Sequence, residues 1–411
     1  MKKITFIFTL SLFIFGSCQN QPPTQVAEEI IVFELPEGAI PMTYINHTIY
    51  LELAFDTIKG NYILDTGADQ LYHDSTFYAD NSFLKNKYLY MTSIGGAGTQ
   101  VRTVQVLPDT VNFSLHDNEY QSLFTPILDL KRVLGDYADG IMGAQFFKQS
   151  VLEVNYENEY IKIYEAIDSV DITSYEKIAL SEKADRFYLP LEIKINDSLS
   201  VSGTFLLDLG ATANVFFTSH IAKQNSFESQ VGYKIAYHAN SIGIGGPSSF
   251  YDFKSDSVRI GNFTLANVVT AYSTDRSGAL AEGNYLGILG NSILDRFDII
   301  IDFINNDLYL KPNTRFEEPF TYLRRGFGYV NRSKTKGVWV IDGFYENSNA
   351  EQAGLKMNDE IIKVNGIDVT TVKLKEEGKL LYQSDSLELT LRLDDSLTKT
   401  IKFKLDDRPN P

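Results

Sequence analysis

The sequence predicts a mostly β protein, in which two similar β-rich lobes are followed by a smaller C-terminal domain. Residues 45–164 and 185–310 pass through the same strand and glycine motifs in the same order, as an internal repeat does. The residues after 321 follow a different pattern. The chain has 411 residues, of which 44% are hydrophobic, and this is enough apolar mass for two or three cores.

The first 17 residues have the features of a secretory signal peptide. Two lysines precede an apolar run over residues 4–15, and two small residues lie directly before Cys18, the only cysteine. This stretch resembles a bacterial lipobox, in which the cysteine is lipidated and becomes the mature N-terminus. The resemblance implies a lipid-anchored protein of the bacterial cell envelope, facing the periplasm, with residues 18–27 as its tether. The alternative is a buried cysteine beside an ordinary cleavage site.

The first lobe is expected over residues 28–172 and the second over residues 173–311. Each begins with an alternating strand and a turn, and then has an apolar strand that ends in Asp-x-Gly. A glycine-rich hairpin tip, a Gly-apolar-apolar-Gly motif and a closing hairpin follow in both lobes. The paired segments are Ile49–Phe55 and Phe187–Ile195, Tyr62–Ala68 and Phe205–Ala211, Ser93–Gly98 and Ser241–Gly246, and Gly140–Gly143 and Gly287–Gly290.

A linker and a third domain complete the chain. Residues 312–321 are polar and bounded by prolines, as domain linkers are. Residues 322–406 are then expected to form a domain with strands at Val338–Ile341 and Glu360–Val364 and a closing hairpin from Leu387 to Phe403. Short helices are expected near Ser348, at capping-box spacing from Glu351, and over Lys373–Leu381.

The two Asp-x-Gly motifs indicate acid–base chemistry. If the lobes pack about a pseudo-twofold axis, Asp65 and Asp208 meet at the interface, and Gly67 and Gly210 let the backbone approach closely. Two carboxyl groups at short distance share a proton, because ionising both is costly. One can then take a proton from water while the other donates to a peptide carbonyl. The alternative is that each aspartate caps a local turn.

These motifs resemble the active-site loops and the apolar-apolar-Gly elements of the pepsin/retropepsin clan of aspartic proteases. The resemblance covers roughly residues 45–311 and implies two retropepsin-like lobes that hydrolyse peptide bonds in extended polypeptides. It assigns Asp65 and Asp208 as the catalytic pair. The other implied residues are Thr66, Gly67, Leu209 and Gly210 in the active-site loops and Ile94, Gly95, Gly96, Ile244, Gly245 and Gly246 in two substrate-binding flaps.

Leu209 departs from the family pattern, which has Thr or Ser at this position. The family hydroxyl hydrogen-bonds across the lobe interface, and a leucine cannot, although Thr66 can make its half of the arrangement. Loss of one such bond costs about 1 kcal/mol of stability, so the departure implies looser geometry rather than abolished chemistry. Ordinary hairpin turns are the alternative for the flap glycines.

The C-terminal domain resembles a PDZ module. Arg325-Gly326-Phe327-Gly328-Tyr329 is similar to its carboxylate-binding loop, and residues 350–355 and 359–366 are similar to its helix and following strand. The resemblance implies that Gly326, Phe327, Gly328 and Tyr329 bind the C-terminal end of a peptide as an added strand. Substrate capture and regulation of the catalytic lobes are both open as its role.

Composition and motifs argue against several other classes of function. The net charge is −16 and no basic stripe occurs, so nucleic acid is not an expected partner, and membrane contact is expected only through the lipid anchor. The five histidines form no metal-binding array, and we expect no metal or other cofactor. His73-Asp74 lacks the Gly-x-Ser-x-Gly of a serine hydrolase, and Asp139 and Asp295 are expected on solvated faces. The alternative to an endopeptidase is an inactive pseudoprotease that serves as a peptide-binding scaffold, and Leu209 favours it.

Overall fold

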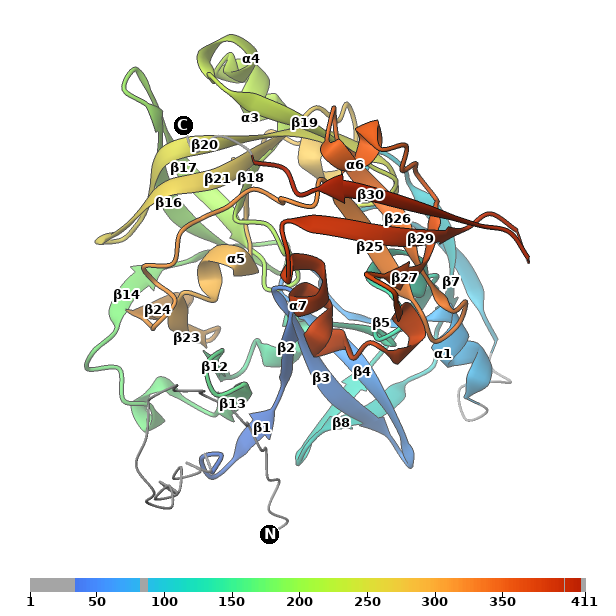
Figure 1. The fold of residues 1–411 in the computed structure, drawn as a ribbon. Coiled ribbons are helices and arrows are strands. Elements are labelled where there is room, and N and C mark those ends of the chain that lie inside the picture. The colour runs from blue at the N-terminus through green and yellow to red at the C-terminus, as the bar shows by residue number, and fades with distance from the viewer. Residues whose placement is uncertain (1–33, 82–87, 395, 408–411) are drawn as a thin grey trace, which may run out of the picture.

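The computed structural model describes residues 34–81, 88–394 and 396–407, and it is mostly β, with 48% strand and 14% helix. The expectation of a mostly β chain is therefore confirmed. The signal peptide, Cys18 and the tether lie outside the described residues. Figure 1 shows the chain as several twisted sheets with short helices at their edges.

The first half of the molecule, which corresponds to the expected first lobe, is built around β4. This apolar strand lies between two other strands of its sheet. It pairs with β3 on one side and runs parallel to β11 on the other. β11 pairs antiparallel with β5, which runs parallel to β10. The strands of this sheet are β2 (Thr43–Ile45), β3 (Thr48–Phe55), β4 (Ile58–Asp65), β5 (Leu71–Asp74), β6 (Tyr90–Ile94), β7 (Arg102–Leu107), β8 (Val111–Leu115), β9 (Asn118–Ser122), β10 (Thr125–Leu128) and β11 (Gly140–Gly143).

The second half repeats these pairings. β17 pairs with β16 and runs parallel to β22, which pairs antiparallel with β18, and β18 runs parallel to β21. β16 also pairs with β20, which closes this part of the sheet on itself. The strands are β15 (Ser181–Lys183), β16 (Arg186–Asn196), β17 (Leu199–Leu207), β18 (Val215–Phe217), β19 (Lys234–Ala239), β20 (Ser248–Ile260), β21 (Phe263–Ser273) and β22 (Gly287–Leu289).

Short helices follow equivalent strands in the two halves. The Asp74 carboxylate caps the helix after β5 by accepting from two backbone N–H groups, and the Thr218 hydroxyl caps the helix after β18 by accepting from Ile221 N. The helices of the two halves are α1 (Ser75–Asp80), α2 (Lys131–Leu134), α3 (Ser219–Gln224), α4 (Phe227–Gln230) and α5 (Asn291–Leu294).

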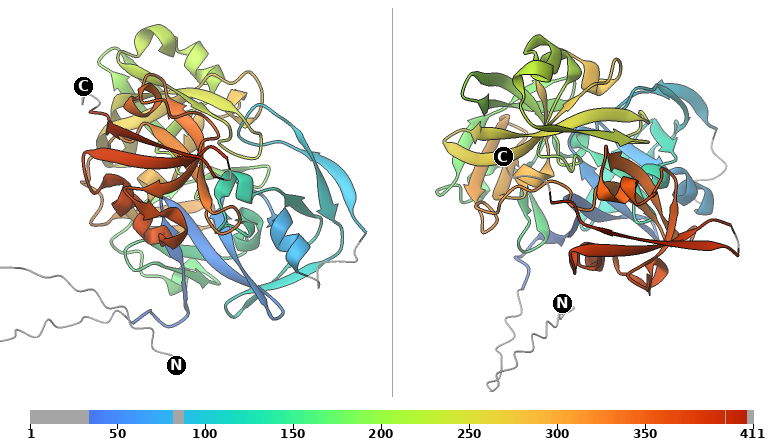
Figure 2. Two further views of the ribbon diagram at one scale, coloured as in Figure 1. Left: turned by 45° about the vertical axis from the view of Figure 1, so that its right-hand side comes forward. Right: turned by 45° about the horizontal axis from the view of Figure 1, so that its top comes forward.

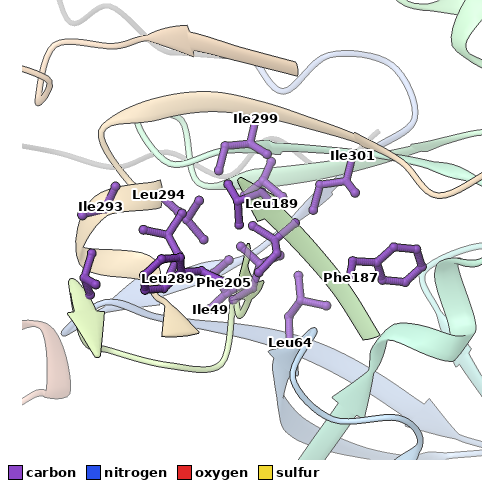
Figure 3. Packing of buried hydrophobic residues seen from close by; sticks show 14 of the residues in the cluster. Ile49, Leu64, Phe187, Leu189, Phe205, Leu289, Ile293, Leu294, Ile299 and Ile301 are labelled. Atoms are coloured by element: carbon purple, nitrogen blue, oxygen red, sulfur yellow. The ribbon is translucent and has the colours of Figure 1, made fainter. Parts of the chain in front are cut away.

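A six-stranded sheet joins the halves. Its two central strands, one from each half, pair antiparallel from Val151 opposite Asp302 to Val154 opposite Ile299. Apolar side chains from both halves pack above it into one continuous core, part of which Figure 3 shows. The strands are β1 (Ala39–Pro41), β12 (Val151–Asn155), β13 (Tyr160–Tyr164), β14 (Glu176–Ala179), β23 (Phe297–Asp302) and β24 (Asp307–Pro312).

The C-terminal domain has a separate core around the fully buried Trp339. It lies against the side of the two halves (Figures 1 and 2), and its β26 pairs with β19 of the second half. Its elements are β25 (Phe327–Arg332), β26 (Val338–Tyr345), α6 (Asn349–Gln352), β27 (Glu360–Val364), β28 (Ile367–Asp368), α7 (Glu377–Tyr382), β29 (Ser386–Arg392) and β30 (Thr398–Lys404).

The segment expected as a linker is packed closely. Pro312 is the last residue of β24, and Phe320 is buried in the core of the two halves. The Arg296 guanidinium stacks over the Phe320 ring, 3.7 Å from its centroid, and donates to the carbonyl of Arg315 at 3.2 Å. Segment 312–321 is therefore fixed to the second half, while the expected domain boundaries stay predictions.

Candidate active site

Asp65 and Asp208 lie side by side where the halves meet. Asp65 is the last residue of β4, opposite Gly143 of β11, and Asp208 directly follows β17, with its N–H donating to the Leu289 carbonyl at 3.0 Å. The buried strands thus deliver the two carboxyl groups to one place, where their side chains hydrogen-bond to each other. A bond between two carboxyl groups requires a shared proton.

Gly67 and Gly210 make this approach possible. A methyl group at Gly67 would lie 2.6 Å from Asp208 Oδ2, and one at Gly210 would lie 2.3 Å from Asp65 Cγ. Each glycine thus faces the aspartate of the other half. Any side chain at either position would push the carboxyl groups apart, which gives a physical reason for Asp-x-Gly in both repeats.

Backbone N–H groups hold both carboxyl groups. Asp65 Oδ1 accepts from Ala68 N at 2.9 Å, and Asp208 Oδ1 accepts from Gly210 N at 2.9 Å and Ala211 N at 3.1 Å. These are also the local turn contacts expected of a capping aspartate. The turn fixes the orientation of each carboxyl group. Unlike an aspartate that only caps a turn, each of these two also contacts the carboxyl group of the other half.

The environment of the pair favours a single shared proton. Burial raises the pKa of Asp65 above its usual range, while the N–H groups of Ala68 and Gly67 and the charge of Arg186 oppose this shift. Burial, and next the charge of Asp65, raise the pKa of Asp208 well above its usual range. The two carboxyl groups therefore hold one proton between them.

The Thr66 hydroxyl bridges the halves. It donates to the Leu207 carbonyl at 2.7 Å and accepts from Leu209 N at 2.9 Å, so it binds the opposite loop on both sides of Asp208. Leu209 itself is fully buried in the main core. The Thr66 half of the expected arrangement is therefore present, and leucine fills the second position with apolar contacts.

Two residues that the sequence reasoning missed hold the Leu209 loop from below. Asn291, the first residue of α5, donates through Nδ2 to the Leu209 carbonyl at 2.5 Å, and its N–H donates to the Ala211 carbonyl at 2.8 Å. Its Oδ1 accepts from the Tyr156 hydroxyl of the first half at 2.7 Å. Asn291 and Tyr156 are both buried, so these bonds are shielded from water. An asparagine directly after Gly290 in an otherwise apolar motif was the available signal.

The two expected flaps are hairpins whose tips touch. We call the β6–β7 hairpin with residues 95–101 the first flap, and the β19–β20 hairpin with residues 240–247 the second flap. Gly245 N donates to the Ala97 carbonyl at 2.8 Å, and Gln100 N donates to the Gly245 carbonyl at 2.9 Å. The structure thus brings the predicted glycine segments together as one interlocked pair.

Each flap places apolar side chains on the opposite half. Ile244 of the second flap packs against the first-half cluster that includes Ala68, three residues after Asp65. Ala97 of the first flap packs against the second-half cluster that contains Phe216. A methyl group at Gly96 would lie 2.5 Å from Ile244 Cγ1, so the glycine makes room for this crossing. Each flap tip is therefore packed on the opposite half, and we call this arrangement closed.

The remaining expected site residues belong to the C-terminal domain, and they are far from the aspartate pair in the sequence. Gly326 has a positive φ of 74° in the turn before β25, and Phe327, Gly328 and Tyr329 are the first residues of that strand. The Phe327 side chain is fully buried in the domain core. These four residues thus form one turn and strand start.

Asp295 and Asp139 do not lie on solvated faces, and that expectation was wrong. Asp295 is 4% exposed and accepts from the Tyr44 hydroxyl at 2.7 Å and from His47 Nδ1 at 3.0 Å. Asp139 is half-buried and pairs with Lys131 Nζ at 2.9 Å. Tyr44 and His47 are 251 and 248 residues away from Asp295 in the sequence, so no local pattern predicts that contact.

His73 is fully buried, and its Nδ1 lies 2.6 Å from the Tyr62 hydroxyl. Burial lowers the pKa of His73 to about 3, so it stays neutral. Within the described ranges, no group of three or more His, Cys, Asp or Glu side chains is arranged to hold a metal ion. No helix in the same ranges is long and apolar enough to cross a bilayer.

Comparison with known proteins adds no family assignment. No protein-family model matches the chain, and no curated protein matches it.

Proposed function

We propose that the chain is an aspartic endopeptidase that hydrolyses peptide bonds in extended polypeptides. The observation that carries this proposal is the contact of Asp65 with Asp208, each faced by the glycine of the opposite half. In this proposal the two halves are retropepsin-like lobes. The repeated strand pairings and the flap hairpins support that reading.

The shared proton gives the two carboxyl groups complementary roles. The ionised member of the Asp65–Asp208 pair takes a proton from the attacking water, and the protonated member donates a hydrogen bond to the peptide carbonyl. The charge that develops on the carbonyl oxygen is thereby neutralised as it forms. The proton then passes to the leaving amine, so the pair acts without a metal ion and without a covalent intermediate.

The C-terminal domain is proposed to be a PDZ domain that binds peptide C-termini. Its turn at Gly326 precedes a strand, β25, that lies at the edge of the sheet and next to α7. An edge strand beside a helix is the arrangement that receives an added peptide strand. The chain is further proposed to be a lipoprotein of the bacterial envelope, anchored at Cys18.

An inactive peptide-binding scaffold is the second candidate. Leu209 and the closed flaps favour it, because a pseudoprotease needs no open cleft and no second loop hydroxyl. Both carboxyl groups and their N–H donors are nevertheless in place, and they favour the enzyme.

The test is incubation of purified residues 19–411 with an unfolded protein mixture between pH 4 and pH 8. An enzyme generates new peptide termini, and these are absent from a parallel Asp65→Asn sample. If both samples yield the same products, or none, the scaffold is the better description.

A further inference from the structure

The C-terminal domain and the second flap share one sheet. β26 pairs antiparallel with β19, with Tyr237 opposite Tyr345 and Ala239 opposite Gly343. In Figure 1 β19 lies beside the C-terminal strands. Asn240 N also donates to the Asp342 carbonyl at 2.8 Å. One strand of the second flap is therefore held by the domain, and the flap cannot lift freely while β26 stays in place.

Tyr237 of this flap strand reaches the glycine turn of the domain. The Tyr237 hydroxyl lies directly beside the backbone of Gly328. Methyl groups at Gly328 and at Gly343 would each lie 2.3 Å from this hydroxyl oxygen, so the two glycines make the path that the phenol follows. The Tyr237 ring stacks on Phe250 within the flap, with ring centroids 5.0 Å apart. It also packs edge-on against Tyr345 of the domain, with ring centroids 4.9 Å apart.

One cation, Arg325, and two carboxylates, Asp342 and Asp252, act on this hydroxyl. The Arg325 guanidinium is close enough to act on the Tyr237 charge state, and it also donates to the Phe327 carbonyl at 2.8 Å and to the Tyr382 hydroxyl at 3.1 Å. A backbone N–H and an arginine beside a glycine turn are donors that a peptide C-terminus accepts from. The phenol oxygen lies in the space beside Gly328 that such a carboxylate would enter.

The first half contacts the edge of β25 that is not paired with β26. Asp136 N donates to the Asn331 carbonyl at 2.8 Å, as an added strand would. The Asp136 carboxylate accepts from Arg332 Nε at 2.8 Å and from Thr335 N at 2.7 Å. The Asp136 side chain is 3% exposed, so this contact is closed to water. The peptide-binding edge is therefore already in use within the chain.

We propose that the groove at Gly328 and β25 is a carboxylate-terminated peptide site that the chain fills with Tyr237 and Asp136, and that this occupancy holds the second flap closed. The proposal rests on the proposed function of the domain and of the flaps. A peptide C-terminus displaces the phenol and the Asp136 segment, which frees β19. Binding in the groove and opening of the second flap are then coupled, and the coupling is reciprocal.

The test compares wild type with Tyr237→Phe in residues 19–411. The variant keeps the ring and its stacking but lacks the hydroxyl, which makes the backbone at Gly328 more accessible to a ligand. Tyr251→Phe is the matched control, because Tyr251 lies on β20 of the same hairpin, opposite Ala236. The probe is a fluorescein-labelled mixture of hexapeptides ending in Val, Leu, Ile or Phe with free carboxylates, beside the same mixture with amidated ends.

Two readouts are used, peptide affinity by anisotropy and amide hydrogen exchange over residues 234–241. We expect Tyr237→Phe to bind the free-carboxylate mixture at least about fivefold more tightly than wild type, a typical size for such coupling, and Tyr251→Phe to match wild type. Exchange over 234–241 should rise in Tyr237→Phe without peptide and in wild type with the free-carboxylate mixture. The amidated mixture should do neither.

Unchanged affinity in Tyr237→Phe, or peptide binding that leaves exchange over 234–241 unchanged, overturns the proposal. Asp136→Ala provides a second route, because it removes the first-half contact and should also tighten peptide binding. Neither readout needs proteolysis. A chain that shows the coupling but cleaves no substrate would contradict the endopeptidase alone, and a chain that cleaves substrate without the coupling would contradict this inference alone.

Discussion

The side-chain amide of Asn291 donates to the carbonyl oxygen of Leu209 at 2.5 Å, directly behind Asp208. Tyr156 from the first half completes this chain of hydrogen bonds. The loop that lacks the second hydroxyl is therefore anchored by a bond from its own half, and that bond is oriented by the other half.

Asn291→Ala should lower both stability and turnover. It leaves the buried Leu209 carbonyl without its donor, which costs about 1–3 kcal/mol of unfolding free energy. Tyr156→Phe should cost about 1 kcal/mol, because only one hydroxyl is lost. Thermal melts and steady-state kinetics check this, with a fall in kcat and little change in KM. Tyr160→Phe is the control, since its hydroxyl bonds Glu153 in the joining sheet. A drop in Tm with unchanged kcat would show that these bonds only hold the fold together.

Leu209→Thr should restore a hydroxyl but lose core packing. Leu209 is fully buried, so Thr and the similarly shaped Val should each destabilise the chain by roughly 1–3 kcal/mol. When Asn291 is retained, Leu209→Thr and Leu209→Val should have similar kcat values, because Asn291 already anchors the loop. In the Asn291→Ala background Thr should give a higher kcat than Val. Equal values for Thr and Val in that background would mean that the hydroxyl does not reach across.

Asp65→Asn and Asp208→Asn should each lower turnover by roughly three or more orders of magnitude, and the double variant should be scarcely worse. The two groups act as one unit, so losing either removes the acid–base pair. Peptide cleavage at the optimum pH measures this. Substantial turnover in Asp208→Asn would leave the second half with a structural role only.

The same variants should keep or raise the Tm above neutral pH. The folded pKa of Asp208 is raised, so its contribution to stability is lost as pH rises. Asn cannot ionise and avoids this loss. A Tm that falls in both single variants at pH 8 would argue that the pair is not strained by its charge.

Asp342 should make the contact between the domain and the second flap pH-dependent. Burial raises the pKa of Asp342 to about 6, while bonds from Ser241 and the charge of Arg132 oppose the shift. The folded chain therefore keeps a proton here that the unfolded chain releases, so this contribution to stability is lost as pH rises from about 4 through 6. Asp342→Asn should raise the Tm at pH 7.5 relative to wild type, with a difference that shrinks towards pH 4. Asp385→Asn, on the exposed surface of the same domain, is the comparison variant.

Cys18→Ser should release the protein from the membrane fraction. The lipid proposed for Cys18 would be the anchor, and its loss would remove the tether. Cell fractionation and immunoblotting of the envelope check this. Continued partition of the variant with membranes would contradict the tether.

Local patterns were sufficient to predict much of the site. Apolar strands that end in Asp-x-Gly, and glycines at hairpin tips, follow from requirements that act within a few residues. The contact of Asp65 with Asp208 could be expected because the motif occurs twice, and a repeated surface can meet itself about a pseudo-twofold axis.

Long-range contacts could not be predicted in this way. Tyr156 and Asn291 lie far apart in the chain, and each alone reads as an ordinary strand or helix residue. The burial of Asp295 depends on partners from both ends of the two halves. The pairing of β19 with β26 uses backbone groups, which every residue carries, so side-chain pattern holds no record of it.

The joining sheet places a requirement on the order in which the chain folds. β12 and β23 are neighbours in space, yet nearly the whole second half separates them in the sequence. During synthesis or export from the N-terminus, β12 emerges with one edge unpaired, and an exposed strand edge invites association with other chains. The first half thus stays vulnerable to aggregation until residues 297–302 arrive, which makes the interval between the halves the period when a holding chaperone would help most.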